Sequence, residues 1–227
     1  MAGIDRRDGR ATGRRLTPTR VASWLHPGVR RVAATIPGRC AEWDRHNAAQ
    51  AGHGPLWLAL GDSSALGIGA SSFGTTALSV AHRSLCARTG QAWRLVNLGE
   101  YGVRLGAVVR NQLPRLHEWG VPDLVTVGAG SNDVAWSFGL SGLLADFEAL
   151  LDGIPSGTVV ATVPPGWFGK GLRVNDWLRV EAARRNLRVA EVGVFPDLGR
   201  MLADDGFHPN DAGYRYIAEG VLAALDR

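Results

Sequence analysis

The sequence predicts an α/β protein in which a parallel sheet is covered by helices on both faces. Two observations support this fold class. From residue 56 onward, short apolar runs alternate with segments of helical periodicity, which is typical of consecutive βαβ units. The first four apolar runs also end at glycine or proline, as buried strands that lead into turns do. The expected strands span residues 56–60, 94–98, 123–127, 158–163 and 188–194, and the expected helices span residues 76–88, 105–119, 142–151, 174–187 and 210–225.

The first 55 residues form a basic amino-terminal extension before this regular pattern. They contain ten arginines and four acidic residues, a net charge of +6. We expect disorder over residues 1–19, two short helical pieces over residues 20–36 separated at Pro27, and a further helix over residues 39–51 anchored by Trp43. Packing of these pieces on the domain is favoured over contact with a membrane surface, because their apolar faces are short.

The positive charge of the extension is a weak indication of a partner. A basic arm can bind nucleic acid or an anionic membrane. However, the whole chain has 24 arginines and a single lysine, so the arginine content reflects a general bias of the sequence. A solvated tail is therefore the favoured interpretation, with peripheral membrane contact through residues 1–55 left open and nucleic acid not expected.

Export and membrane insertion are not indicated. The apolar segment near the amino terminus is broken at His26 and Pro27, whereas a signal peptide needs an uninterrupted apolar region of ~7–15 residues. No apolar run approaches the ~20 residues that span a bilayer. We therefore expect a cytoplasmic protein. Cys40 and Cys86 have no metal or redox spacing, and we expect two unpaired thiols.

Four polar segments follow expected strands or lie near the end of the chain. Right-handed crossovers place the carboxyl ends of all parallel strands at one edge of the sheet, where such sheets bind ligands. These segments are therefore expected to meet there. They are Gly61-Asp62-Ser63, the stretch from Asn97 to Gly102, Gly130-Ser131-Asn132-Asp133 and Asp205-Gly206-Phe207-His208.

Together the four segments supply the groups that acyl transfer by a serine requires. Ser63 is the expected nucleophile, His208 the base and Asp205 the group that orients the imidazole. The backbone N–H groups of Ser63 and Gly102 and the side-chain amide of Asn132 are the expected oxyanion donors. Two alternatives remain open at this point, since Ser64 can replace Ser63 and Asp204 can replace Asp205. Asp62 and Asp133 are expected to hold turns by hydrogen bonds.

In these four blocks the sequence resembles the SGNH hydrolases, also called the GDSL family. The resemblance covers roughly residues 56–225, and Ser64 stands where the family name has leucine. It implies a flavodoxin-like three-layer α/β/α fold over residues 56–227 and hydrolysis through an acyl-enzyme, with no metal or organic cofactor. It also assigns the oxyanion role to Gly102, although Gly99 lies in the same block.

The expected function is hydrolysis of a small-molecule carboxylic ester or thioester. One alternative is removal of O-acetyl groups from carbohydrate or cell-envelope material at the same site, and another is a non-catalytic basic binding module. Trp136, Phe138, Trp167 and Phe168 lie on loops beyond strand ends. They are expected either to wall an acyl or sugar pocket or to pack in the core.

Overall fold

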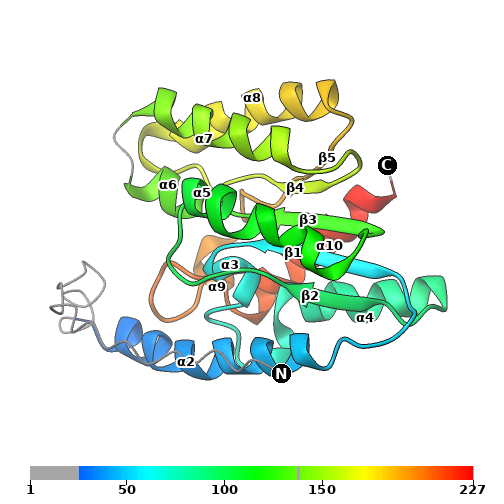
Figure 1. Ribbon diagram of the computed structural model, residues 1–227. Coiled ribbons are helices and arrows are strands. Elements are labelled where there is room, and N and C mark those ends of the chain that lie inside the picture. Colours follow the sequence, from blue (N-terminus) through cyan, green and yellow to red (C-terminus); the bar gives the residue numbers. More distant parts are fainter. Residues whose placement is uncertain (1–25, 137–138, 227) are drawn as a thin grey trace, which may run out of the picture.

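A parallel sheet of five strands forms the centre of the protein, in the order β2-β1-β3-β4-β5. The computed structural model describes residues 26–136 and 139–226. The strands are β1 (Leu56–Gly61), β2 (Arg94–Asn97), β3 (Leu124–Gly128), β4 (Val159–Ala161) and β5 (Arg188–Ala190). This order is that of flavodoxin-like sheets. It confirms the predicted three-layer α/β/α fold (Figure 1).

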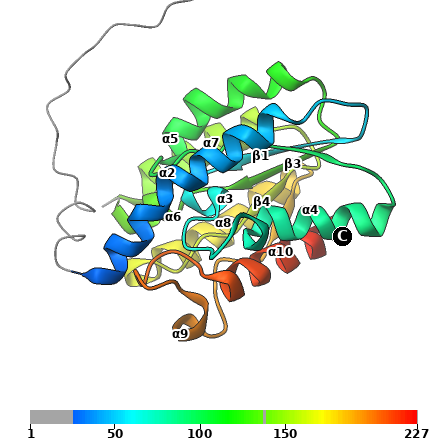
Figure 2. The ribbon, with the colours of Figure 1, turned by 90° about the horizontal axis from the view of Figure 1, so that it is seen from below.

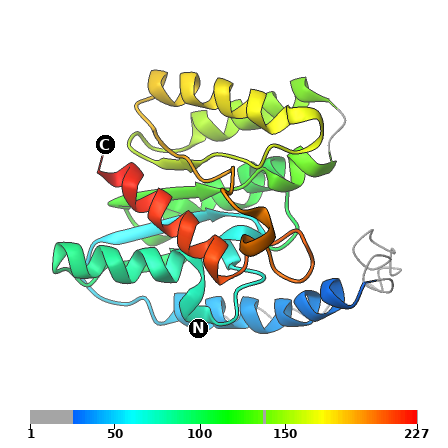
Figure 3. The same ribbon diagram turned by 180° about the vertical axis from the view of Figure 1, so that it is seen from behind.

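Helices cover both faces of the sheet. One layer contains α5 (Leu105–Ala107), α7 (Leu140–Gly153) and α8 (Lys170–Arg184), and the other contains α4 (Ala77–Thr89) and α10 (Asp211–Leu225). The view from behind shows α10 and α4 lying across the second face (Figure 3). Local signals set the ends of these two helices. Gly90 closes α4 with a left-handed φ of 65°, and the Asn210 side chain caps the amides of Ala212 and Gly213 at the start of α10.

Short elements occupy several strand ends. They are α3 (Ser63–Leu66), α6 (Ser131–Trp136), α9 (Leu198–Met201) and two single 3-10 turns, Phe73–Thr75 and Trp167–Gly169. None of them was predicted, because one turn of helix leaves no periodicity for a sequence pattern to show. Two of them nevertheless contain predicted site residues, since α3 begins at Ser63 and Asn132 is the second residue of α6.

The predicted helix over residues 105–119 is wrong as a continuous α-helix. After α5 the chain forms a π-helical turn, Val108–Gln112, and then a 3-10 segment, Leu113–Trp119. Pro114 lacks the N–H that a continuing α-helix requires. The buried Gln112 side chain also bonds both backbone groups of Gly61, at 2.8 and 2.9 Å, which fixes this turn against β1.

Strands β4 and β5 are shorter than predicted, because a side chain takes the place of the backbone hydrogen bonds that would extend their pairing. The hydroxyl of Thr162 accepts the backbone N–H groups of Val192 and Gly193 at 2.9 and 2.8 Å. These two amides therefore do not extend the pairing of β4 with β5, which ends at Ala190.

Two hydrophobic cores flank the sheet, since successive side chains of a strand point to opposite faces. Leu58 and Leu60 of β1 belong to the core under α7 and α8, whereas Trp57 and Ala59 belong to the core under α4 and α10. Every residue of β1 is buried, in agreement with its uninterrupted apolar run.

The described part of the extension is one long helix, α2 (Pro27–Ala48). The predicted separate helix from residue 39 is therefore wrong, because the helix continues through Pro37 to Ala48. The predicted boundary at Pro27 agrees with the start of α2, and the helical piece expected before it lies outside the described residues. Pro27 occupies the first helical position, where its missing N–H costs nothing. Pro37 lies inside the helix, and the buried side chains of Val32 and Trp43 on either side of it hold α2 on the domain. Trp43 shares the core of α4 and α10.

Helix α2 also covers the outer edge of β2, the first strand of the sheet (Figure 2). Asn47 bonds both backbone groups of Asn97, donating to its carbonyl at 2.8 Å and accepting its N–H at 3.0 Å. Gln50 accepts the N–H of Leu95 at 3.0 Å, and His46 contacts the carbonyl of the same residue at 3.0 Å. Side chains of α2 and of the residues after it thus replace a neighbouring strand and leave this stretch of the edge without free groups.

Two further sequence expectations concern thiols and membranes. Cys40 and Cys86 are both free and half-buried. Among the helices of the described residues, none combines the length and the apolar character needed to cross a bilayer.

Candidate active site

Ser63 is the first residue of α3, directly after β1 and the turn residue Asp62. Its side chain is almost completely buried. Asp62 accepts the Ser64 N–H at 2.9 Å with one carboxylate oxygen and the Ser131 hydroxyl at 2.8 Å with the other. Burial raises the pKa of Asp62, although both hydrogen bonds oppose the rise. Asp62 therefore joins the ends of β1 and β3 and holds the start of α3, as the sequence led us to expect.

The structure brings Ser63, His208 and Asp205 into one hydrogen-bonded chain. Ser63 Oγ lies 3.1 Å from His208 Nε2. His208 Nδ1–H donates to Asp205 Oδ2 at 2.6 Å. The other oxygen of Asp205 accepts the backbone N–H groups of Phe207 and His208, both at 3.0 Å. Burial by itself raises the pKa of Asp205. The hydrogen bond from His208 and those from the two amides outweigh it, so this pKa lies below its ordinary value.

The two alternatives left open by the sequence occupy other positions. Asp204 is exposed and accepts two hydrogen bonds from Arg31 of α2, at 3.0 and 2.8 Å. It is thereby turned toward α2, while Asp205 contacts the imidazole. His208 Nε2 contacts the hydroxyl of Ser63, and Ser64 is the residue whose N–H Asp62 caps.

A hydrogen bond links two of the three segments that carry the expected oxyanion donors. Asn132 Nδ2 donates to the carbonyl of Val103 at 2.9 Å, next to Gly102. Gly102 has a φ of 73°, a conformation that favours glycine. The N–H of Ser63 belongs to the first turn of α3, where amides have no partner within the helix.

The structure also separates Gly99 from Gly102. The Gly99 N–H donates to the side-chain oxygen of Asn97 at 2.9 Å, and a Cβ at Gly99 would come within 3.1 Å of Ala65 Cβ. By contrast, nothing among the described residues lies within 4 Å of a Cβ at Gly102. Gly102 is therefore the more open of the two backbone positions.

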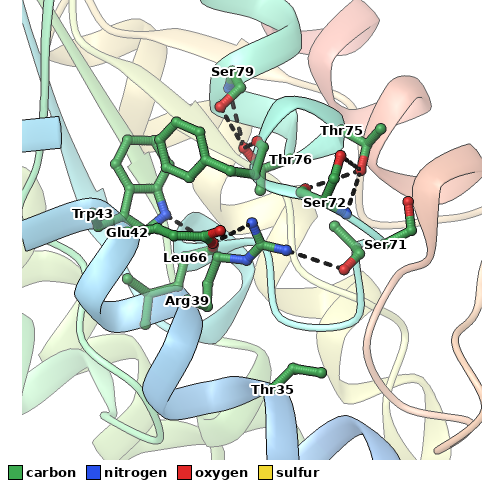
Figure 4. Close-up of polar contacts among 12 residues, drawn as sticks. Thr35, Arg39, Glu42, Trp43, Leu66, Ser71, Ser72, Thr75, Thr76 and Ser79 are labelled. Carbon is green, nitrogen blue, oxygen red and sulfur yellow. Dashed lines mark hydrogen bonds and ion pairs between the residues drawn. The ribbon is translucent and has the colours of Figure 1, made fainter. Parts of the chain in front are cut away.

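The backbone carbonyls that follow Ser63 are held from three other parts of the chain. A buried carbonyl needs a donor, and after the single turn of α3 the backbone supplies only some of them. The remaining bonds run from Asn97 Nδ2 to Ala65 O at 2.9 Å, Trp43 Nε1 to Leu66 O at 2.9 Å, Tyr214 OH to Ile68 O at 2.7 Å and Arg39 Nη2 to Ala70 O at 3.1 Å. Figure 4 shows Trp43 and Arg39 reaching this turn from α2. The turn that follows Ser63 is thus held by β2, α2 and α10.

Two aromatic side chains lie beside the imidazole, and neither was expected from the sequence to have a role there. The ring of Tyr101 stacks beside His208 at a centroid distance of 6.4 Å, and Phe207 meets its edge at 5.0 Å. Both residues belong to segments already singled out for their polar members. Their position within those segments was the available signal.

A cavity of about 560 Å³ opens beside the site. Phe168, one of the four loop aromatics, lines it, whereas Trp136 is exposed and does not belong to its lining. Phe138 and the side chain of Trp167 fall outside the described part of the chain. Of the two aromatics that can be placed, one therefore walls a pocket and neither packs in the core.

A family model described as the GDSL-like lipase/acylhydrolase family matches residues 59–216. The chain belongs to this family. The matched region includes all five site residues, whereas α2 precedes it. The predicted resemblance is therefore confirmed for the domain, and the extension is an addition to it.

Solved structures share the fold of this GDSL hydrolase at low sequence identity. The structure of TesA is 22% identical with a TM-score of 0.63, and the match covers 75% of this chain and 97% of that chain. The lipase Lip_vut3 from a goat rumen metagenome is 16% identical with a TM-score of 0.61, at 75% and 97% coverage. A carbohydrate acetylesterase family member from Sinorhizobium meliloti is 17% identical with a TM-score of 0.60, at 76% and 100% coverage. No curated protein sequence matches the chain.

Proposed function

We propose that this GDSL hydrolase cleaves a carboxylic ester or thioester through an acyl-enzyme on Ser63. The observation that carries the proposal is the chain of contacts from Ser63 Oγ to His208 Nε2 and from His208 Nδ1 to Asp205. A nucleophile, a base within hydrogen-bond reach and a third group that orients the base are the three parts of an activated serine.

The hydrogen bond to Asp205 determines which ring nitrogen of His208 carries the proton. Asp205 is ionised at neutral pH, because its pKa is lowered, and a carboxylate only accepts hydrogen bonds. His208 Nδ1 therefore carries the proton. In the neutral ring Nε2 is then an acceptor, directed at the Ser63 hydroxyl.

In the first half of the reaction Ser63 Oγ bonds to the substrate carbonyl carbon while its proton passes to His208 Nε2. The bond to the leaving oxygen or sulfur then breaks, and His208 returns the proton to the departing alcohol or thiol. In the second half, water gives a proton to His208 and attacks the acyl carbon. Ser63 leaves with that proton, which restores the enzyme and releases a carboxylic acid.

The negative charge of the tetrahedral intermediate requires fixed donors. The Ser63 and Gly102 backbone N–H groups and the second N–H of the Asn132 amide fill this role in the proposal. The first N–H of that amide is bound to the Val103 carbonyl. This bond fixes the amide plane in advance, so little reorganisation is needed during the reaction.

The test is Ser63→Ala, with Ser64→Ala as the matched control next to it. Ser63→Ala should abolish ester hydrolysis and labelling by an organophosphorus serine probe, while its thermal melt stays close to that of the wild type. Ser64→Ala should keep both activities. Hydrolysis by a folded Ser63→Ala protein at the wild-type rate would refute the mechanism.

Removal of acetyl groups from carbohydrate is the second candidate at the same site. It is supported by the fold shared with the carbohydrate acetylesterase family member from Sinorhizobium meliloti. Comparing acetylated oligosaccharides with aryl esters of matched solubility separates the two. A non-catalytic binding module would react with neither substrate nor the serine probe.

A further inference from the structure

The cavity beside the active site extends into the protein between the sheet and the helices α4 and α10. At its mouth it is lined by His208 and by Asp62 and Ser64, the residues on either side of Ser63. Deeper in, three neighbouring strands contribute Ala59, Thr126 and Ala161, and α4 contributes Ala77 and Ala81. Of the five candidate site residues His208 belongs to this lining, so the cavity adjoins the site at His208 and continues from there between the sheet and α4.

The space exists because small side chains face one another there. Ala59, Thr126 and Ala161 belong to β1, β3 and β4, and two alanines of α4 are among the residues opposite them. The only hydroxyl of these five side chains, on Thr126, accepts a hydrogen bond from Trp57 Nε1 at 2.9 Å. The inner wall thus presents methyl groups and has no unsatisfied polar atom from these residues.

The size and lining of the cavity suit an apolar part of a ligand. Small-molecule sites are concave and lined mainly by apolar side chains. A volume of about 560 Å³ lies within the range of small-molecule sites. An acetyl group at Ser63 would leave most of it empty, whereas an unbranched hydrocarbon chain would fill it and gain the free energy of burial.

We propose that this cavity binds the acyl chain of the substrate, an unbranched chain of medium to long length. The inference rests on the proposed ester hydrolysis and specifies which esters are preferred. The acyl carbonyl lies at Ser63, and the chain passes His208 and continues between the sheet and α4. The alcohol or thiol part remains outside, toward solvent.

The first experiment narrows the inner end of the cavity. Ala81→Leu places a larger side chain at a buried lining position of α4, and Ala87→Leu makes the same change at an exposed position of the same helix. We expect the wild type to hydrolyse octanoyl and dodecanoyl esters with a higher kcat/KM than acetyl esters. Ala81→Leu should reduce kcat/KM for dodecanoyl esters at least about tenfold and leave kcat/KM for acetyl esters unchanged. Ala87→Leu should leave kcat/KM for both kinds of ester unchanged.

The second experiment measures binding without chemistry. In the Ser63→Ala background, free dodecanoate below its micelle concentration should raise the Tm, and Ala81→Leu should remove this rise. A folded Ala81→Leu protein with an unchanged chain-length profile and an unchanged Tm rise would overturn the proposal. A wild type that prefers acetyl esters and gains no stability from dodecanoate would also overturn it.

These readouts separate the two levels of inference. Failure of the acyl-chain proposal leaves Ser63-dependent hydrolysis of acetyl esters intact. If the proposed function is wrong, the wild type will hydrolyse no ester and will not react with the serine probe. The Tm shift with dodecanoate then tests by itself whether the cavity binds an acyl chain.

Discussion

Two buried carboxylates beside the nucleophile have pKa values displaced in opposite directions. Burial raises the pKa of Asp62 more than its hydrogen bonds from Ser64 and Ser131 lower it. Burial acts on Asp205 too, but the hydrogen bonds that this carboxylate accepts, one of them from an imidazole, outweigh burial. The surroundings therefore favour the ionised form of Asp205, the form that supports a charged histidine, and they disfavour it at Asp62.

Asp205→Asn should reveal this difference in the pH dependence of stability. Because the folded-state pKa of Asp205 is lowered, its ionised form stabilises the fold at pH values above the ordinary carboxyl pKa of ~3.9. That contribution is lost as the pH falls through the lower folded-state value. The Tm difference between wild type and Asp205→Asn should be constant above about pH 5 and shrink toward zero in acid. A difference that grows on acidification would contradict the lowered pKa.

Asn132→Ala tests the side-chain oxyanion donor. Removing one such donor typically lowers kcat ~10²–10³-fold with little change in KM. The amide also holds the Val103 carbonyl, so a purely structural role would lower the Tm and leave kcat per folded molecule near the wild-type value. Both quantities should be measured on one preparation. Ser131→Ala is the matched control, since its hydroxyl holds Asp62 from the adjacent position.

The proximity of Ser63, His208 and Asp205 was predictable from local signals. Ser63 and Asn132 lie in the turns that follow two apolar runs, and Asp205 lies three residues before the only histidine in such a setting. Trp43 and Arg39 carry no comparable signal, because they bind the backbone carbonyls of Leu66 and Ala70. Every residue has a backbone carbonyl, so the sequence does not show which carbonyl a side chain will bind. Such contacts can be identified only in the folded structure.

At the scale of elements, α2 connects the described part of the extension to the segment around Ser63. The family match begins at residue 59, after α2 ends. Two of its side chains hold the turn that follows Ser63, and another side chain bonds the edge strand β2 at Asn97. Asn97 in turn holds Ala65 within α3. Two routes of hydrogen bonds therefore lead from α2 to the segment around Ser63.

Trp43→Phe should lower kcat while keeping most of the packing. Phenylalanine retains an apolar ring but has no N–H for the Leu66 carbonyl, which would then lie buried without this donor. Ser63 should be displaced slightly, and we expect kcat and the rate of labelling by a serine probe to fall about tenfold. Trp93→Phe is the control, because it removes an indole N–H bonded to Thr89 at the surface. A lowered Tm with unchanged kcat in Trp43→Phe would show that the bond serves folding alone.

The elements that the sequence misjudged are those in which tertiary contacts override local rules. The stretches before residue 36 and after residue 39 were interpreted as separate helices, yet Pro37 lies inside one continuous helix. Between residues 105 and 119, regular apolar spacing indicated one helix, but Pro114 and the bonds of Gln112 to Gly61 divide it. Strand and helix alternation survived these errors, because it depends on many residues at once.

At the scale of the whole molecule, α2 ties the amino-terminal part of the chain to two separate regions of the domain. Beyond its contacts with β2 and the turn after Ser63, Arg31 of α2 pairs with Asp204, the residue next to Asp205. A bond between exposed side chains contributes little stability by itself. The contacts nevertheless place one helix beside both the nucleophile segment and the segment that carries His208.

Two truncations separate the role of α2 from that of the residues before it. Residues 1–19 contain no catalytic candidate, so their removal should leave the Tm and the kcat on a small soluble ester close to the full-length values. Removal of residues 1–50 should lower both the Tm and kcat, because the carbonyls of Leu66 and Ala70 lose their side-chain donors. It should also promote association, because it exposes the edge of β2. Melting curves, turnover and sedimentation of the two proteins at equal concentration provide the comparison. If the shorter protein retained full-length turnover, the domain that begins near residue 56 would position Ser63 without help, and the contacts of α2 would stabilise the fold alone.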